Sequence, residues 1–355
     1  MYHRLLKWSG VIGSLLMALA IAGMLVYSFK KPLIYVRAEG SEQTQDHRTQ
    51  TGQVVFEELA PTVREDADGL CIPVASGVTQ EAIHIDTDYV NHIMTITVDG
   101  MGTADLSDGV YGSLSGINRI QAADWEDQLI LMVLMEDSYE YGAILENQKL
   151  LLNLKMPREL YDRIVVLDAG HGGTDTGITV NGVTESELVL DVAARVRELL
   201  LDEGIRVYMT RTDKEDPDDA ARVSLANGIR ADMYISLHLA GGEDYGIAAS
   251  YNGTYFTPAL TNAELADLLV RCTAEAVNNR GIGVFEIEKS TEGGQEEEKP
   301  EEALDQAQVP AVYLELGAPG NSDEAALLRR DDYRQDLARG IAQAILAAYG
   351  ERRGY

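Results

Sequence analysis

The stretch IVVLDAGHGG, residues 164–173, decides the fold of the C-terminal half of this chain. A continuous apolar run of this length is typical of a strand buried on both faces, and the glycines after it indicate a tight turn at the strand's carboxyl end. Ligands bind at this edge in open α/β sheets. The sequence therefore predicts a buried strand that ends beside a binding site.

Strand-like apolar runs alternate with amphipathic helical segments from about residue 160 onward. The expected helices span 184–203, 219–229, 261–279 and 333–349, and the expected strands span 164–167, 205–209, 233–237 and 311–316. The helix at 261 begins with the Thr-x-x-Glu spacing of a capping box. Repeated β–α units predict an α/β domain over residues 160–350, with a mainly parallel twisted sheet covered by helices on both faces.

The N-terminal region contains an uncharged apolar segment over residues 8–29. It is long enough for one membrane-spanning helix and longer than the usual core of a cleaved signal peptide. We therefore predict a cytoplasmic stub and transmembrane signal anchor in residues 1–32, which attaches the chain to the cell membrane with the bulk of the chain outside the cytoplasm. The alternative is a cleaved signal peptide, which would give a secreted protein.

Two regions separate this segment from the α/β domain. Residues 33–80 are polar and irregular, which is typical of a spacer. Residues 81–156 contain short β-like segments broken by Gly, Asp and Asn, which predicts a small all-β domain. In general character and position alone, this domain resembles the cell-wall-targeting β-domains called AMIN.

Composition and charge exclude several classes of function. Of the 355 residues, 45% are hydrophobic and 25% are charged, which is a globular composition. Acidic residues outnumber basic ones by 58 to 29, and the formal net charge of -29 repels DNA and RNA, so we expect no nucleic-acid partner. Two cysteines, Cys71 and Cys272, are too few for a disulfide framework or a cysteine-based zinc site.

Two histidines, His171 and His238, are the only ones from residue 160 onward, and each follows a predicted strand. Because the carboxyl ends of parallel strands meet at one edge, we expect both imidazoles there, together with Glu315 at the end of another strand. Two imidazoles and a carboxylate that leave a fourth position open are typical of a catalytic zinc site. The sequence therefore predicts a metal centre at this edge.

The third ligand has two candidates, Glu185 and Glu187, at the start of the helix after the His171 turn. Thr184 and Glu187 have the spacing of a capping box, which would turn Glu187 back onto the backbone and leave Glu185 to face the metal. A carboxylate that only complements the helix dipole is the alternative interpretation of Glu185.

The C-terminal half contains, in order, LDAGHGGTDTG, GVTESELVLDVA, VYMTRTD with ARVSLAN, ADMYISLH and VPAVYLELG. Over residues 162–350 these motifs resemble the zinc-dependent N-acetylmuramoyl-L-alanine amidases of the amidase-3 type. The resemblance implies that His171, Glu185 and His238 bind Zn²⁺ and that Glu315 is the catalytic glutamate. It implies hydrolysis of the amide between N-acetylmuramic acid and L-alanine of peptidoglycan by a zinc-activated water, in cell wall remodelling.

Other functions stay open at this point. One is a membrane-anchored, catalytically silent protein that binds peptidoglycan or regulates another enzyme. Another is a zinc peptidase that cleaves within the stem peptide. The acidic segment 288–308, inserted before the Glu315 strand, has the composition of a solvated flexible loop. The alternative for this segment is a regulatory insert over the metal, on which an activator protein would act.

Overall fold

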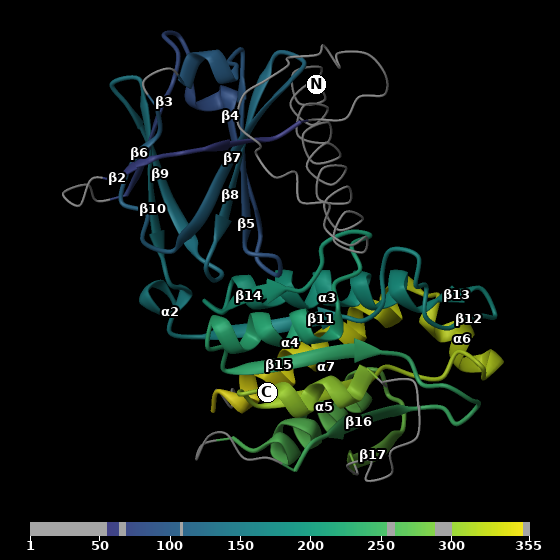
Figure 1. The fold of residues 1–355 in the computed structure, drawn as a ribbon. Coiled ribbons are helices and arrows are strands. Elements are labelled where there is room, and N and C mark those ends of the chain that lie inside the picture. Colours follow the sequence, from purple (N-terminus) through teal and green to yellow (C-terminus); the bar gives the residue numbers. More distant parts are fainter. Residues whose placement is uncertain (1–54, 64–68, 107–108, 254–259, 288–299, 351–355) are drawn as a thin grey trace, which may run out of the picture. The chain divides into compact units, whose positions relative to one another are not determined.

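The computed structural model describes residues 55–63, 69–106, 109–253, 260–287 and 300–350 (Figure 1). The chain divides into two compact units. The first is a β unit within residues 55–154, and the second is an α/β unit that begins at Lys155 and includes the short segments Tyr89–Asn91 and Asp137–Glu140.

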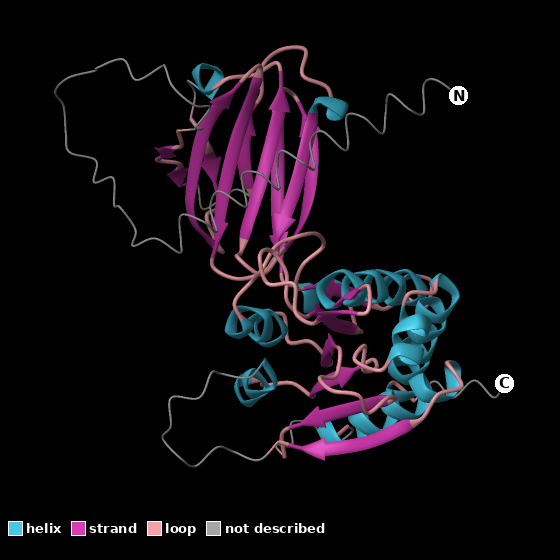
Figure 2. Ribbon diagram, turned by 90° about the vertical axis from the view of Figure 1, so that its right-hand side faces the viewer, coloured by secondary structure: helices cyan, strands magenta, loops and turns pink. Residues whose placement is uncertain are grey.

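The β unit contains two five-stranded sheets, and its described helices are two short 3₁₀ turns, η1 (Gln80–Ala82) and η2 (Thr103–Leu106) (Figure 2). One sheet has the order β1 (Glu57–Leu59), β7 (Ile117–Trp125), β8 (Gln128–Met135), β5 (Ile93–Asp99) and β4 (Ile83–Asp88). The other has the order β2 (Thr62–Val63), β6 (Tyr111–Gly112), β3 (Leu70–Pro73), β10 (Lys149–Lys155) and β9 (Glu140–Glu146).

Strands β1, β2 and β3 lie within residues 57–73, where a polar spacer was expected over 33–80. That expectation is wrong for these residues, because Leu70, Cys71 and Ile72 of β3 are buried and pair in register with β10. The apolar run Leu70-Cys71-Ile72 is only three residues long and lies between Gly69 and Pro73, so it is too short to show a strand pattern in the sequence.

The α/β unit is built on a six-stranded sheet with the order β14-β11-β15-β18-β16-β17. Its strands are β11 (Ile164–Ala169), β14 (Arg206–Met209), β15 (Met233–His238), β16 (Ile247–Tyr251), β17 (Gly281–Glu286) and β18 (Ala311–Glu315). A separate hairpin pairs β12 (Thr179–Val180) with β13 (Val183–Thr184). The helices are α2 (Pro157–Leu160), α3 (Glu185–Leu201), α4 (Asp219–Gly228), α5 (Asn262–Ala276), η3 (Pro300–Gln306), α6 (Ser322–Leu328) and α7 (Asp331–Ala348).

The sheet is mixed: its pairings are parallel, as expected, except for that of β16 with β18, which the sequence did not indicate. Strands β14, β11, β15 and β18 are parallel, but β16 runs antiparallel to β18, and β17 runs parallel to β16. A parallel connection needs a crossover of roughly a dozen residues or more. The connection from β15 to β16, Leu239–Gly246, is shorter than that, so β16 returns in the opposite direction.

Buried apolar side chains lie on both faces of this sheet. Helices α3, α5 and α7 pack on one face, against Val165, Ile235 and Leu314. Helix α4 and η3 pack on the other face, against Val166 and Ala311. The continuous apolar run IVVL of β11 therefore follows from burial on both sides.

The expected transmembrane helix finds no support in the structure. Among the described residues, no helix is both long enough and apolar enough to cross a membrane. The longest, α7, carries charged side chains along its exposed face, such as Asp332 and Arg339, and a spanning helix needs about 20 predominantly apolar residues. Residues 8–29, on which the expectation rested, lie outside the described residues.

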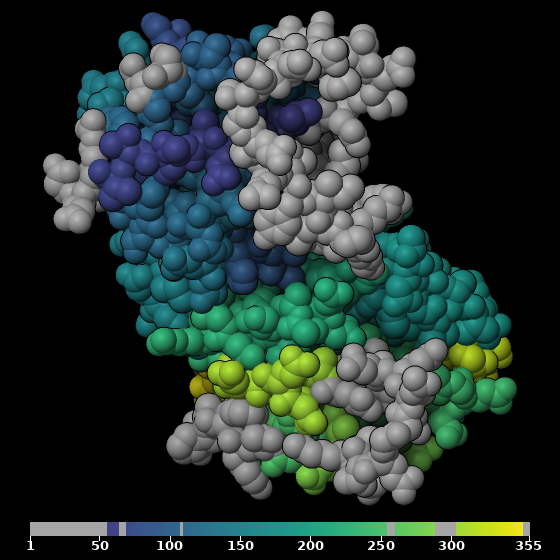
Figure 3. Space-filling view, in the orientation of Figure 1, coloured from purple at the N-terminus to yellow at the C-terminus, as the bar shows by residue number. Residues whose placement is uncertain are grey.

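The acidic segment 288–308 is described only from residue 300 onward. Its last part is not a solvated loop, which corrects that expectation, because Leu304 and Ala307 are buried in the core beneath β18. In the space-filling view, η3 packs directly against α4 (Figure 3), and Asn227 donates a hydrogen bond to the Gln306 carbonyl at 3.0 Å. A regulatory role for residues 288–299 stays a prediction.

Candidate metal centre

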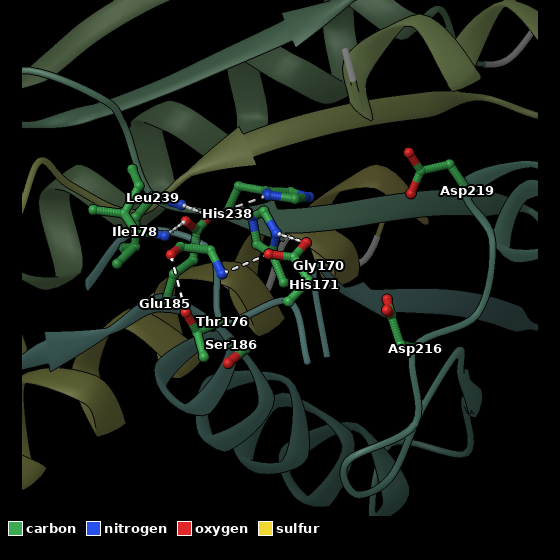
Figure 4. Close-up of polar contacts among 12 residues, drawn as sticks. Gly170, His171, Thr176, Ile178, Glu185, Ser186, Asp216, Asp219, His238 and Leu239 are labelled. Carbon is green, nitrogen blue, oxygen red and sulfur yellow. Dashed lines mark hydrogen bonds and ion pairs between the residues drawn. The ribbon is translucent and has the colours of Figure 1, made fainter. Parts of the chain in front are cut away.

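Three of the predicted site residues converge at the carboxyl edge of the sheet (Figure 4). His171 lies in the turn after β11, Glu185 is the first residue of α3, and His238 is the last residue of β15. One ligand atom from each residue lies within 4.8 Å of the other two. Asp216 and Asp219 lie apart from this cluster (Figure 4).

The donor atoms lie slightly closer together than the ligands of a bound zinc ion do. Oε1 of Glu185 is 3.1 Å from Nε2 of His171 and 3.1 Å from Nδ1 of His238. Donors held about 2.0–2.2 Å from a tetrahedral zinc lie about 3.3–3.6 Å from one another. Small outward movements would therefore admit the ion, and two nitrogens with one oxygen form the donor set of a catalytic site with an open fourth position.

The Glu185 carboxylate is fixed by the backbone on both sides. Its Oε2 accepts a hydrogen bond from the Ile178 N–H at 2.8 Å, and its Oε1 accepts one from the Leu239 N–H at 2.8 Å. The residue is only 1% exposed. Burial raises the pKa of Glu185, but the hydrogen bonds with His171 and His238 outweigh burial and hold the pKa well below its usual range.

Glu185 and Glu187 are distinguished by a different feature from the expected capping box. The Thr184 side chain makes no capping hydrogen bond, so the expected capping box with Glu187 does not form. Glu187 is instead exposed on the helix surface. Glu185 reaches the cluster because it is the first helical residue and its carboxylate lies against the backbone of Ile178 and Leu239.

His171 is oriented by a carboxylate that sequence reasoning missed. Oδ2 of Asp175 is 2.6 Å from Nδ1 of His171, which leaves Nε2 of the ring toward Glu185. Burial lowers the pKa of His171, but the hydrogen bonds with Glu185 and Asp175 outweigh burial and raise the pKa to about 9. An acidic residue four positions after the histidine, in GHGGTD, is the sequence signal that could have indicated Asp175.

Two glycines allow these side chains to approach one another. A Cβ at Gly170 would lie 2.1 Å from the His238 ring. Gly177 has a φ of 60°, and a Cβ there would lie 2.6 Å from both the Glu185 carboxylate and the His171 ring. Only glycine fits at these two positions of the turn.

Two buried arginines hold the backbone of the His171 turn. Arg211 donates to the carbonyls of Ala169 (2.7 Å), Gly170 (2.9 Å) and Ser186 (2.8 Å), so it joins this turn to the first turn of α3. Arg222 donates to the carbonyl of His171 at 2.9 Å. These guanidinium groups fix the positions from which His171 and Glu185 reach the cluster.

Arg222 also pairs with Asp168, the aspartate of the opening stretch. Oδ1 of Asp168 is 2.8 Å from Nη1 of Arg222 and accepts from Thr210 at 2.5 Å, while Oδ2 accepts from Ser236 at 2.5 Å. Burial raises the pKa of Asp168, but the Arg222 charge and the two hydroxyl donors outweigh burial and hold it well below its usual range. Asp168 thus anchors the turn from beneath and lies outside the cluster of three.

Glu315, the predicted catalytic glutamate, ends β18 beside the cluster. Strands β15 and β18 pair so that Glu315 is the Cα partner of His238. The Tyr313 ring stacks on the His238 ring with centroids 4.2 Å apart. Because side chains alternate along a strand, Glu315 projects from the same face of β18 as Tyr313. This register places a half-buried carboxylate next to the candidate metal ligand His238.

The sequence model of the amidase-3 family, described as N-acetylmuramoyl-L-alanine amidase, matches residues 165–347. The chain belongs to this family. It is therefore a hydrolase of a family that acts on peptidoglycan, and the zinc-type donor set of the cluster agrees with that assignment.

Relatives match about half of the chain. The endolysin of Bacillus phage SPP1 is 28% identical over 192 residues, which cover 52% of this chain and 65% of the endolysin. The germination-specific N-acetylmuramoyl-L-alanine amidase of Bacillus subtilis is 28% identical over 212 residues, which cover 54% of this chain and 82% of that protein. The crystal structure of N-acetylmuramoyl-L-alanine amidase from Clostridium difficile 630 is 26% identical and covers 54% of this chain and 98% of that chain, with a TM-score of 0.47.

Proposed function

We propose that this chain hydrolyses the amide bond between the lactyl group of N-acetylmuramic acid and the L-alanine of the peptidoglycan stem peptide, with Zn²⁺ held by His171, Glu185 and His238. The observation that carries the proposal is the convergence of these three donors within 4.8 Å at the sheet edge, in a chain of the amidase family. Since peptidoglycan lies outside the cytoplasm, the proposed substrate implies an extracytoplasmic site of action in cell wall remodelling.

The bound zinc would lower the pKa of a water ligand to roughly 7 and polarise the amide carbonyl. The protein's own residues supply the remaining steps. Glu315 accepts a proton from the attacking water and donates it to the leaving amine nitrogen of L-alanine, a transfer that typically contributes about 10²–10⁴-fold. Asp175 accepts the Nδ1 proton of His171 and so keeps Nε2 free as a ligand.

The buried position of Glu185 suits the ligand role. Its hydrogen bonds with the two imidazoles keep the carboxylate ionised, and those from two backbone N–H groups hold it in place before the metal arrives. A carboxylate that only complemented the helix dipole would need no contact with two imidazoles. The contacts at 3.1 Å to both rings therefore favour the ligand interpretation.

Glu315→Gln tests whether Glu315 transfers protons without taking part in zinc binding. We expect the variant to retain one zinc per chain while turnover of soluble muropeptides falls by about 10²–10⁴-fold. The matched control is Glu187→Gln, which neutralises an exposed carboxylate in the first turn of α3, and it should keep wild-type zinc content and turnover.

Two results would contradict the proposal. Wild-type turnover by Glu315→Gln would remove Glu315 as the proton-transfer group. A wild-type chain that binds peptidoglycan without releasing stem peptide would favour the catalytically silent binding protein instead.

A further inference from the structure

Glu324, on α6 beyond the Glu315 strand, is a buried carboxylate that the mechanism above does not use. It is 2% exposed. Its Oε2 accepts a hydrogen bond from the Ala318 N–H at 2.8 Å, and its Oε1 accepts from the Gly246 N–H and from Nδ2 of Asn279, each at 3.0 Å. All three donors are neutral amides, so no positive charge compensates the buried carboxylate. Its hydrogen bonds instead fix the backbone at Ala318 and Gly246.

The backbone that Glu324 organises flanks Glu315 on two sides. Ala318 belongs to the turn directly after β18, and Gly246 directly precedes β16. These strands pair antiparallel, and Ala248 of β16 is the Cα partner of Glu315. One side chain therefore ties the turn that follows Glu315 to the start of the neighbouring strand β16.

The turn after Glu315 is shaped around this carboxylate. Gly317 has a φ of 137°, and a Cβ there would lie 2.9 Å from the Glu324 carboxylate. The Gly317 carbonyl accepts a hydrogen bond from the Ala240 N–H at 2.8 Å, which connects the turn to the chain just after His238. A displacement of the turn would therefore reach Glu315 and the end of the His238 strand.

Glu324 itself is held from the opposite side. Oδ1 of Asn321 caps α6 by accepting hydrogen bonds from the N–H groups of Asp323 at 3.0 Å and Glu324 at 3.2 Å. Asn279 donates to the hydroxyl of Tyr333 on α7 at 2.9 Å as well as to Glu324. The carboxylate is thus preorganised by α6 and α7 before it meets the turn.

We propose that Glu324 is a positioning residue that fixes the Glu315 carboxylate for proton transfer. This inference rests on the proposed role of Glu315 as the proton-transfer group. Misplacement of a reacting group by about 1 Å can cost 10²-fold in rate. A loss of Glu324 should therefore appear in kcat rather than in substrate or metal binding.

Glu324→Gln is the direct test. In the wild type both carboxylate oxygens accept hydrogen bonds from backbone N–H groups, whereas in the variant the NH₂ group would face one of these donors. We expect kcat on soluble muropeptides to fall by about 10–100-fold, with KM within twofold of wild type and one zinc per chain retained. Gly317→Ala, which pushes on the same turn from the other side, should give the same kcat-selective loss, so the inference stays testable if Glu324→Gln folds poorly.

Asn262→Ala is the matched control. Asn262 is also 2% exposed, and its Oδ1 accepts from the Ala311 N–H at 3.1 Å at the opposite end of β18. The control should lower the unfolding midpoint while kcat stays within twofold of wild type. A purely structural role for Glu324 would make the two variants behave alike.

The outcomes separate the two proposals. If Glu315→Gln is inactive with zinc bound but Glu324→Gln and Gly317→Ala keep wild-type kcat, the positioning role is wrong and the proposed function stands. The positioning role is also wrong if both variants lose zinc. The same holds if their loss of kcat is no more selective than that of Asn262→Ala. If wild type releases no stem peptide, or Glu315→Gln turns over normally, the proposed function itself fails.

Discussion

The buried ion pair beneath the His171 turn gives a prediction whose size follows from its geometry. Asp168→Asn removes the charge opposite Arg222 but can keep the hydrogen bonds. The Ser236 hydroxyl donates to Asp168 in the wild type, and in the variant it can rotate to accept a hydrogen bond from the asparagine NH₂ group. Breaking a buried pair by removing one partner costs about 3–5 kcal/mol. The Arg222 side chain is only 2% exposed, so water cannot replace the lost charge.

Two further carboxylates moderate this cost. Asp216 and Asp219 lie 3.5 and 3.7 Å from Arg222, and their side chains are 27% and 52% exposed. Such partly solvated partners compensate weakly. We therefore expect the free energy of unfolding of the α/β unit to fall by about 3 kcal/mol at pH 7, the lower end of the range.

The pH dependence provides an independent check on the same pair. The pKa of Asp168 is held well below its usual range in the folded state, whereas its unfolded value is about 3.9. The contribution of the Asp168 carboxylate to the free energy of unfolding is therefore complete at pH values above its pKa in the unfolded state. This contribution is lost as the pH falls toward its pKa in the folded state. The difference between wild type and Asp168→Asn should be constant from pH 6 to 8 and smaller at pH 3.5, by less than about 1 kcal/mol.

Hydrogen exchange during urea unfolding is the suitable assay, since peptides from β11 and β15 report on this sheet rather than on the β unit. A difference below about 1 kcal/mol at pH 7 would refute the reasoning, because it would mean that the pair is solvated or replaced. A difference that grows as the pH falls from 4 to 3.5 would refute the assigned ionisation of Asp168.

Three further predictions concern the cluster itself. Asp175→Asn should weaken zinc binding by about 10–100-fold, measured by competition with a chromophoric chelator, because His171 loses the carboxylate 2.6 Å from its Nδ1; unchanged affinity would show that Asp175 does not orient the ring. Gly170→Ala should abolish stoichiometric zinc in elemental analysis, since its Cβ would lie 2.1 Å from the His238 ring, and a variant with full zinc would contradict that steric argument. The pKa of metal-free His171 is raised to about 9, so zinc binding at pH 7 should release about one proton, and this release should decline above pH 9. Calorimetry in two buffers of different ionisation enthalpy measures the proton release. Equal binding heats in both buffers would contradict the prediction.

The sequence was sufficient for features with strong local signals. The run IVVL is apolar on every position because β11 is covered on both faces, and the glycines after it are needed where the turn approaches His238 and Glu185. The proximity of His171 and His238 could be predicted from the sequence because each lies at the carboxyl end of a strand in the parallel part of the sheet. The capping box at Thr261 and Glu264 also forms as predicted.

Features that depend on distant partners were not visible in the sequence. The reversal at β16 follows from a short connection and from pairing with β18, more than 60 positions away. The burial of Leu304 depends on contacts with α4 and the sheet, which override the acidic composition around it. Glu324 looks like an ordinary acidic residue in the first turn of α6, and only the fold brings the Gly246 and Ala318 amides to it.

The most direct test of the central claim is to identify the bond that the purified chain cleaves in a defined muropeptide, together with its zinc content. Mass spectrometry of the products should show a peptide with a free L-alanine amino group and an intact lactyl carboxylate on N-acetylmuramic acid, with one zinc per chain that His238→Ala removes along with turnover. Cleavage between residues of the stem peptide would identify a peptidase instead, and turnover without zinc would contradict the metal centre at His171, Glu185 and His238.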